Sequence, residues 1–320
     1  MQVHTDIEHI PLFNKAVITI GTFDGVHLGH QKILSQLKEE ADCTGGETVI
    51  ITFHPHPRKI IQGTSGNLQL INTIEERIEL IAALGIQHIV VVPFTPSFSQ
   101  LTPQQYVEDF LLNKFHPDTI IIGHDHRYGK ERMGNFQLLE NYSSKHYFSL
   151  KEIPAKVIND STVSSTLIRK AILNSDLASA NMHLGYSFFF QGTVIKGDKR
   201  GRALGFPTAN LKVDSEEKII PGNGVYAVLA SINSPGNEGR TFKGMMNIGV
   251  RPTVNGSTRS IETHLFDFSG DIYGSKMKIS IKKLLRHEQK FDGLDILTRQ
   301  LKKDEDEPGF FLALRLGSGL

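Results

Sequence analysis

Two segments of the sequence combine glycines with side chains suited to binding phosphate. The first is Gly21–His30 (GTFDGVHLGH), in which His27 and His30 lie three residues apart. The second is Gly197–Asn210 (GDKRGRALGFPTAN), in which two arginines lie between glycines. Glycine lets the backbone approach a ligand closely, and imidazole and guanidinium groups donate to phosphate oxygens. We therefore expect two phosphate-binding sites in different parts of the chain.

The first segment lies between a predicted strand and a predicted helix. Ala16–Ile20 (AVITI) has the pattern of a buried strand, and His30–Ala41 has apolar residues on one helical face. In an open parallel sheet, ligands bind at the carboxyl ends of the strands, where a helix N-terminus offers free N–H groups to an anion. A histidine pair at this spacing is more often structural, but its position here favours phosphate binding. The segment has neither a Walker A loop nor a G-x-G-x-x-G motif, which indicates another kind of phosphate site.

Three further polar segments follow predicted strands or open a helix. His54–Pro57 (HPHP) comes after the strand Thr48–Phe53, and Gly123–Gly129 (GHDHRYG) ends the strand that begins at Thr119. Val163–Arg169 (VSSTLIR) supplies hydroxyls and an arginine at the start of a helix. Each segment alone is equally consistent with a turn or a helix cap. Together with the first glycine segment they lie at one edge of the predicted sheet, which indicates a ligand site.

The histidines of these segments are also compatible with a metal site. Six imidazoles could be gathered into a zinc or dinuclear hydrolase site: His27, His30, His54, His56, His124 and His126. The stiffness of the His-Pro-His-Pro segment and the lack of a helical H-E-x-x-H motif count against it. We favour phosphate binding and keep the metal site as the alternative.

The second half contains groups suited to a nucleotide with a bound metal. Thr208 and Asn210 offer oxygens to Mg²⁺ at the end of the second glycine segment, and Arg202 lies within it. A flexible basic hairpin is the alternative for this segment. Glu262 stands among the strand residues of Ser260–Phe268, so its carboxylate is either on a solvent face or a positioned base. The pattern alone favours solvent.

The first half alternates short strands with amphipathic helices, which predicts βαβ units and a mostly parallel sheet. His88–Val92 is a further strand pattern. Thr73 begins a capping box and a helix that ends at Gly85, with Ala82 among its inward residues. Thr102 has the spacing of a second N-cap.

The second half predicts five or six antiparallel strands in a small closed barrel, because its strand-like runs are separated by Gly, Pro, Asn and Asp. The runs are Phe188–Ile195, Gly224–Ile232, Thr241–Ile248, Ser260–Phe268 and Lys276–Leu284. A last helix with Asp292 as its N-cap would pack outside the barrel through Leu294, Leu297 and Leu301.

The two halves also differ in charge and in histidine content. Residues 1–184 hold 15 Lys and Arg against 19 Asp and Glu, whereas residues 185–320 hold 20 against 15. Of the 14 histidines, 12 precede Gly185. A predicted short helix over Ser175–Gly185 ends the first half. We therefore expect an α/β Rossmann-like domain over 1–184 and an antiparallel β-barrel domain over 185–320.

The composition excludes several classes of protein. A formal net charge of +1 argues against a chain that coats nucleic acid or an anionic membrane. The single cysteine, Cys43, cannot form an intrachain disulfide, and the N-terminal residues lack the apolar segment of a secretory signal. The apolar runs are far shorter than the ~20 residues that cross a bilayer. We expect a cytoplasmic protein that acts on small molecules, with no nucleic-acid or membrane partner.

The motifs together resemble a known enzyme family. GTFDGVHLGH with VSSTLIR resembles the H-x-G-H nucleotidylyltransferase superfamily, and FHPHP with GHDHRYG narrows this to the FAD synthetase module of bacterial bifunctional riboflavin kinase/FMN adenylyltransferases. GDKRGRALGFPTAN, NIGVRPT and IETHLFDF resemble the riboflavin kinase module of the same family. The resemblance covers residues 12–303.

For the first module, the resemblance implies transfer of AMP from ATP to FMN. The phosphate of FMN has a second pKa of about 6 and arrives ionised, so the site must align and neutralise charge rather than supply a base. The implied catalytic residues are His27, His30 and Arg169. The implied ATP and phosphate contacts are Gly21, Phe23, Asp24, His27, Gly29, His30, Ser164, Ser165, Thr166 and Arg169. The implied flavin and nucleotide contacts are Phe53, Pro55, His56, Pro57, Asp125 and Arg127.

For the second module, the resemblance implies phosphorylation of riboflavin by ATP. The 5′-hydroxyl of riboflavin is a poor nucleophile, so a carboxylate must accept its proton, and the family pattern gives this role to Glu262. Glu262 and Arg286 are the implied flavin contacts, and Thr208 and Asn210 the implied Mg²⁺ contacts. The implied ATP contacts are Gly201, Arg202, Gly205, Phe206, Pro207, Thr208 and Asn210. Mg²⁺ accompanies ATP, and riboflavin, FMN and FAD are the substrates and products.

The sequence departs from the family pattern at two places. Leu167 stands where relatives often carry a basic residue, which puts one phosphate contact in doubt. The tail from Asp304 does not match the usual ending, and we expect it to be loosely packed or disordered. Two other functions remain as alternatives: a pantetheine- or nicotinamide-type nucleotidylyltransferase with an accessory barrel, and a flavin-sensing protein without turnover.

Overall fold

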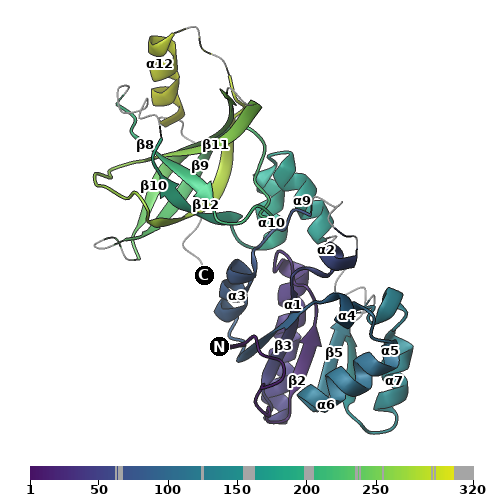
Figure 1. The fold of residues 1–320 in the computed structure, drawn as a ribbon. Coiled ribbons are helices and arrows are strands. Elements are labelled where there is room, and N and C mark those ends of the chain that lie inside the picture. The colour runs from purple at the N-terminus through teal and green to yellow at the C-terminus, as the bar shows by residue number, and fades with distance from the viewer. Residues whose placement is uncertain are drawn as a thin grey trace. The chain divides into compact units, whose positions relative to one another are not determined.

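The computed structural model describes residues 1–61, 63, 68–123, 126–153, 163–197, 205–234, 237, 239–253, 256–289, 291 and 293–305. The chain forms two compact units, Met1–Ser165 and Thr166–Leu320 (Figure 1). Among the described residues, no helix combines the length and the apolar composition needed to cross a membrane.

The first unit is built on one sheet of six parallel strands, which confirms the predicted α/β class. Its strand order is β1 (Gln2–His4), β4 (His88–Pro93), β3 (Thr48–His54), β2 (Val17–Ile20), β5 (Thr119–Gly123) and β6 (Ser149–Ile153). The central strands are β-branched and buried on both faces, as expected for a parallel sheet. The edge strands β1 and β6 were not predicted, because they are short and largely exposed.

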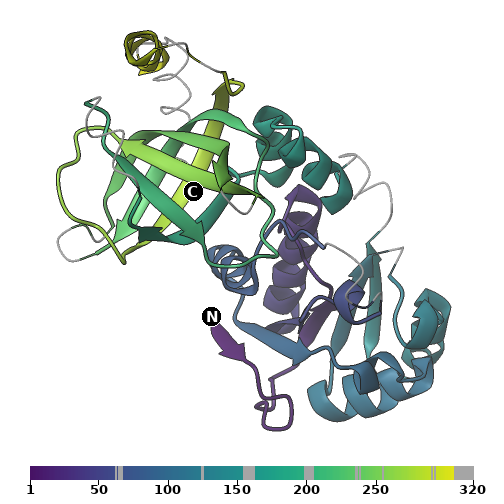
Figure 2. The same ribbon diagram turned by 45° about the horizontal axis from the view of Figure 1, so that its top comes forward.

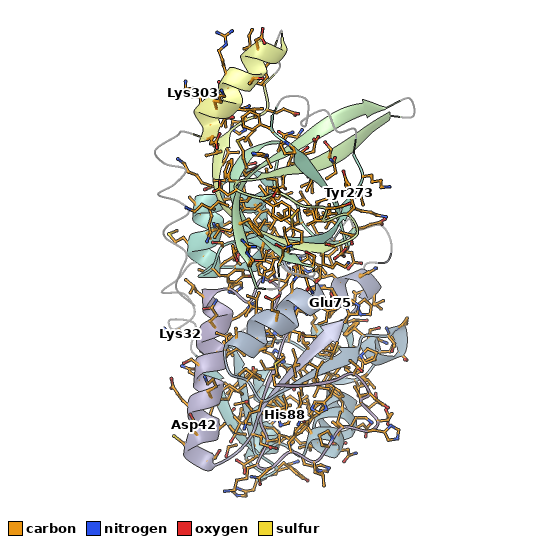
Figure 3. The ribbon with its side chains drawn as sticks, turned by 90° about the vertical axis from the view of Figure 1, so that its left-hand side faces the viewer. Lys32, Asp42, Glu75, His88, Tyr273 and Lys303 are labelled. Carbon is orange, nitrogen blue, oxygen red and sulfur yellow. The ribbon has the colours of Figure 1, made fainter. Side chains whose placement is uncertain are left out.

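Helices cover both faces of this sheet (Figures 1 and 2). Alternate strand residues point to opposite faces, so Val17 packs with α1 and α3 while Ile18 packs with η2 and α7. The helices of this unit are α1 (Leu28–Thr44), α2 (Pro57–Ile61), α3 (Ile74–Ala83), α4 (Pro96–Ser99), α5 (Pro103–Gln105), η2 (Tyr106–Leu112), α6 (Asn113–Phe115), η3 (Lys130–Arg132) and α7 (Phe136–Ser143). Lys32 and Asp42 mark the exposed side of α1 in Figure 3.

The capping predictions for α3 and α5 are confirmed. Thr73 and Thr102 each accept a backbone N–H through the side chain and complete a capping box. The predicted inward face of α3 is wrong at Ala82, which is exposed. Glu76 and Arg77 are buried in its place, at 2% and 1% exposure. Periodicity alone assigns charged residues to the outside, and here specific polar partners reverse that assignment.

In the described part of the second unit, two helices precede a closed barrel and a third follows it. The two that precede it are α9 (Ser165–Leu173) and α10 (Leu177–Leu184). Asp176 is the N-cap of α10, and the helix ends at a left-handed Gly185, which confirms the predicted glycine cap. The barrel order is β10 (Thr241–Thr253), β11 (Gly256–Leu265), β8 (Thr208–Val213), β7 (Phe189–Ile195), β12 (Lys276–Arg286) and β9 (Gly224–Asn233). All of its pairings are antiparallel, which confirms the predicted barrel.

The last helix, α12 (Leu294–Glu305), packs on the barrel through Leu301, which lies against Val225 and Met245. Its predicted N-cap, Asp292, lies outside the described residues. The expectation of a loose tail from Asp304 is wrong at its first residue. Asp304 belongs to α12 and is 4% exposed, because it forms an ion pair described below.

Candidate active sites

The loop after β2 turns sharply and places a histidine at the start of α1. Phe23, Gly25 and Val26 all have positive φ angles, of 48°, 92° and 36°. The side chains of Phe23 and Val26 are buried at 3% and 1% exposure, so the core holds the strained turn in place. A Cβ at Gly21 would meet the ring of Phe23 at 3.1 Å. A side chain at position 21 would therefore require the ring of Phe23 to shift by a few tenths of an ångström.

The structure brings His27 and His30 together, as the sequence predicts. His27 is the N-cap of α1, and its Nδ1 accepts the backbone N–H of His30 at 3.3 Å. The two rings stack with centroids 3.6 Å apart, and the edge of Phe23 contacts His30 at 5.2 Å. Because Nδ1 of His27 accepts, its proton is assigned to Nε2.

His30 is held as a neutral imidazole. Burial lowers its pKa well below the ordinary value, and the charges of His27 and Arg77 lower it further. Its Nδ1 is buried and has no hydrogen-bond partner within the described part of the chain. His30 can therefore donate through Nε2 without carrying a charge.

Asp24 and Gly29 lie close to this pair in sequence but in different settings. Asp24 is 2% exposed, and its Oδ1 accepts the N–H groups of Ile71 and Asn72 at 2.9 and 3.1 Å. This carboxylate therefore anchors the segment before α3. Gly29 is buried in the first turn of α1.

Ser165, the last residue of the first unit, contacts the same loop. Ser165 Oγ donates to the carbonyl oxygen of Asp24 at 2.9 Å. Ser164 and Thr166 are exposed, and Arg169 is half-buried one turn further along α9. One member of the predicted phosphate clamp is thus joined to the glycine loop by a hydrogen bond.

The predicted flavin contacts of the first unit have different environments. Phe53 is buried and meets Phe94 edge to face at 5.5 Å. His56 is buried, and its Nδ1 accepts the N–H of Arg58 at 3.1 Å, so it caps α2, which begins at Pro57. Pro55 follows a cis peptide bond and is half-buried. Arg127 is exposed, and Asp125 lies outside the described residues.

The sequence analysis missed a run of aromatic contacts beside these residues. Phe98 meets Phe53 at 5.8 Å and Tyr106 at 6.0 Å. Tyr106 stacks on Tyr128 at 5.0 Å, and Tyr128 stacks on His126 at 5.8 Å. These rings come from β3, α4, η2 and the segment after β5, so no local motif reveals them. We call these five rings the aromatic wall. Phe53, Tyr106 and Tyr128 are buried in the core of the unit, whereas Phe98 and His126 are half-buried.

In the barrel, strand register places Glu262 among the predicted magnesium contacts. Glu262 lies directly opposite Asn210 of β8 and opposite Asn247 of β10. Thr208 Oγ1 donates to Glu262 Oε2 at 3.3 Å. Glu262 is half-buried, and its neighbour Thr263 points into the barrel with 0% exposure. Of the two alternatives for this carboxylate, the hydrogen-bonded position favours the positioned base.

The end of the second glycine segment lies beside a shallow hollow. His264 Nδ1 donates to the carbonyl oxygen of Pro207 at 2.8 Å, and its ring meets Phe206 at 5.2 Å. The hollow has a volume of about 410 Å³, and Gly205 and Glu305 are among the residues that line it. Gly201 and Arg202 lie outside the described residues.

The side chain of Arg286 forms an ion pair with the last helix. Its Nε donates to both oxygens of Asp304, at 3.1 and 2.9 Å, and its Nη2 lies 2.9 Å from Oδ2. Gln300 also donates to Asp304, at 2.7 Å. The guanidinium lies 5.4 Å from the ring of Phe291. Sequence analysis predicted the arginine but missed its acidic partner.

The alternative of a metal site finds no support among the described residues, where no group of three or more histidine, cysteine or acidic side chains is arranged to hold a metal ion. His54 is exposed, His56 caps a helix, and His124 lies outside the described residues.

Two protein-family models match successive parts of the chain. The family model for FAD synthetase matches residues 10–167, and that for riboflavin kinase matches residues 184–309. The bifunctional riboflavin kinase/FMN adenylyltransferase of Listeria monocytogenes is 39% identical over 298 residues, which cover 93% of this chain and 92% of the relative. The enzyme of the same name from Bacillus subtilis is 37% identical, over 92% of this chain and 91% of the relative.

A crystal structure shares the fold over most of its length. It is described as a macrolide-efflux protein from Streptococcus pneumoniae, and it is 28% identical to this chain. The match has a TM-score of 0.85 and covers 95% of this chain and 97% of that one.

Proposed function

Because the chain belongs to the bifunctional riboflavin kinase/FMN adenylyltransferase family, we propose that it makes FAD in two steps. ATP first phosphorylates riboflavin to FMN, and a second ATP then transfers AMP to FMN with release of pyrophosphate. The observation that carries the proposal is that each half has its own hydrogen-bonded cluster, the Thr208–Glu262 contact and the His27–His30 pair. We assign the kinase to residues 185–320 and the adenylyltransferase to residues 1–184.

In the kinase half, Glu262 is the base. Its carboxylate accepts the proton of the 5′-hydroxyl of riboflavin as that oxygen attacks the γ-phosphorus of ATP. The hydroxyl of Thr208 orients the carboxylate. Thr208 and the amide of Asn210 are hard oxygen donors beside it, which fits Mg²⁺ carried by ATP, and Mg²⁺ neutralises phosphate charge when bound. The hollow beside Gly205 and Pro207 would take the rest of the nucleotide.

Of the remaining kinase predictions, Gly201 and Arg202 are assigned to the phosphates and Phe206 to the nucleotide. Arg286 is assigned to the edge of the flavin site. Its bidentate pairing with Asp304 fixes the direction of the guanidinium, and its Nη1 donates to the carbonyl oxygen of His287 at 3.5 Å.

In the adenylyltransferase half, no base is needed, because the attacking phosphate of FMN is already ionised at neutral pH. His27 and His30 donate through Nε2 to the phosphates of ATP and stabilise the charge that moves to the leaving pyrophosphate. The family resemblance also assigns Gly21, Gly29 and Arg169 to the ATP phosphates. The other ATP contacts that it implies are Phe23, Asp24 and the hydroxyls of Ser164, Ser165 and Thr166.

The flavin of FMN is assigned to the aromatic wall that contains Phe53. The other flavin and nucleotide contacts that the family resemblance implies are Pro55, His56, Pro57, Asp125 and Arg127. The proposal includes a cytoplasmic location, small-molecule substrates, and no nucleic-acid or membrane partner.

One chromatographic assay tests the proposed function. The purified chain is incubated with riboflavin, ATP and Mg²⁺, and the formation of FMN and then FAD is followed over time. Parallel reactions replace riboflavin by FMN, by phosphopantetheine or by nicotinamide mononucleotide. Formation of FAD from riboflavin supports the proposal. Products only from the other two acceptors would favour the alternative nucleotidylyltransferase, and flavin binding without any product would favour a sensor.

A further inference from the structure

Val26, the residue before His27, has a backbone conformation that valine rarely adopts. Its φ angle is 36°, and its side chain is 1% exposed. A β-branched side chain at positive φ crowds the backbone, so this conformation is unfavourable by itself. Strained residues persist only where the surrounding structure holds them, and they cluster at active sites and ligand clamps. The contacts that hold Val26 therefore bear on the function of His27.

Both backbone groups of Val26 are hydrogen-bonded. Its N–H donates to the carbonyl oxygen of Phe23 at 3.0 Å, within the loop between β2 and α1. Its carbonyl oxygen accepts a hydrogen bond from Nε2 of Gln31 at 2.9 Å. Gln31 lies on α1, four residues after His27, and is half-buried. Neither the motif nor the proposed reaction gives this glutamine a role.

The side chain of Gln31 supplies a donor that the helix start lacks. In an uninterrupted helix, the carbonyl oxygen of Val26 would accept the backbone N–H of His30. Here that N–H donates to Nδ1 of His27 at 3.3 Å instead. Because a carbonyl oxygen can only accept, the amide of Gln31 must turn its NH₂ group toward Val26. The glutamine thus replaces the backbone donor that the His27 cap has taken.

Gln31 holds the peptide groups on both sides of His27. Its side chain binds the carbonyl of Val26, and its backbone N–H donates to the carbonyl oxygen of His27 at 2.9 Å. Peptide groups are planar, so two fixed carbonyls fix the direction in which the side chain of His27 leaves the backbone. Any residue at position 31 except proline supplies the backbone N–H. The contact with Val26 is the one that depends on glutamine.

We propose that Gln31 is a positioning residue of the adenylylation site, where its side-chain amide holds the carbonyl of Val26 and thereby keeps His27 aligned as a phosphate donor. This inference rests on the proposed function of His27 in phosphate binding. A misplacement of about 1 Å at a reacting site is enough to lower a rate strongly. Gln31 acts in this role without a contact of its own to ATP.

The first test is the kinetics of Gln31→Met in the full-length chain, since methionine has a similar length and no donor. His27 is proposed to stabilise charge that moves to the leaving pyrophosphate. The kcat of FAD formation from FMN should therefore fall about tenfold, while KM for ATP changes less than about twofold. FMN formation from riboflavin, measured on the same preparation, should stay normal.

Gln137→Met is the matched control. This glutamine is exposed on α7, and its amide donates to Glu140 at 2.6 Å. The same change of side chain at this position should leave both reactions unchanged. An unchanged kcat in Gln31→Met, or a KM for ATP that rises while kcat stays normal, would overturn the inference.

Hydrogen exchange of the His30 amide gives a second readout that does not depend on activity. This N–H is the one that the ring of His27 caps. In Gln31→Met it should exchange about tenfold faster than in the wild type, because the cap is no longer held in place. Equal exchange rates in Gln31→Met and Gln137→Met would contradict the proposal.

Two further outcomes keep the claims separate. If Gln31→Met does not fold, the wild type decides: one side-chain N–H of Gln31 should exchange slowly with solvent, and rapid exchange of both would refute the inference. Should His27→Ala retain full FAD formation, the proposed function of His27 is wrong, while exchange of the His30 amide still reports on Gln31.

Discussion

The candidate sites in the two halves of this molecule contain opposite kinds of side chain. In the parallel-sheet half, two histidines lie at the entrance of a helix and offer N–H donors. In the barrel half, a carboxylate lies beside the hydroxyl and amide groups of the neighbouring strand. The difference follows from the nucleophile, because a phosphate arrives ionised and a hydroxyl does not. A base is therefore needed in one half only.

The largest expected effect is that of Glu262→Gln on the kinase step. Loss of the base should lower the rate of FMN formation on the order of 10³-fold, while FAD formation from supplied FMN stays close to normal. Both rates are measured by chromatography on one preparation. Glu216→Gln, at an exposed acid of the same unit, is the control. An equal loss of both activities would contradict the assignment of one reaction to each half.

Asp304→Ala should destabilise the barrel without affecting the parallel-sheet half. It leaves Arg286 with its charge unpaired in a site where the two side chains are 14% and 4% exposed, and the expected cost is about 3 kcal/mol. Hydrogen exchange of β12 and α12 in the full-length chain measures it. Asp295→Ala, at an exposed position of the same helix, should cost a few tenths of a kcal/mol at most. Matching exchange rates in the two variants would show that the pair contributes nothing.

His30→Ala should impair the adenylyltransferase reaction and leave the kinase reaction intact. Removal of one donor to the phosphates should lower FAD formation on the order of 10²-fold, with FMN formation from riboflavin retained. His9→Ala changes a histidine whose side chain is 83% exposed and serves as the control. Unchanged FAD formation would mean that His30 is a packing residue.

The smallest expected effect is that of Thr73→Ala. Loss of the cap of α3 should lower the free energy of unfolding of the parallel-sheet half by about 1 kcal/mol. Local hydrogen exchange in α3 measures the change, and Lys32→Ala on the exposed side of α1 is the control. If exchange in β12 accelerates equally, the two halves do not unfold independently.

Much of the architecture was predictable because it follows from local patterns. The strand that begins at Thr119 and the helix that begins within Val163–Arg169 were both predicted, because runs of β-branched residues and hydroxyl caps are visible in the sequence itself. The strand Thr208–Val213 was not predicted, because its residues also fit a phosphate loop and are only half-buried. Its pairing with β11 depends on residues about 50 positions away.

The candidate sites were predictable in residue type but not in surroundings. The pairing of His27 with His30 follows from their spacing on a helix. The burial of Arg77 does not, because it depends on Thr52 in a strand and on Asp24 in a loop. The orientation of Glu262 depends on strand register, which a single strand cannot reveal.

The closure of the barrel has a consequence for how the chain is made. Its first strand, β7, pairs with its last strand, β12, which also pairs with β9. The sheet of the first unit is complete once β6 has been synthesised, at Ile153. The barrel cannot close until Arg286 has left the ribosome, and its ion pair needs Asp304 as well. We therefore expect the adenylyltransferase half to mature first during translation, and chains that stop before α12 to carry a folded first half and an open kinase barrel.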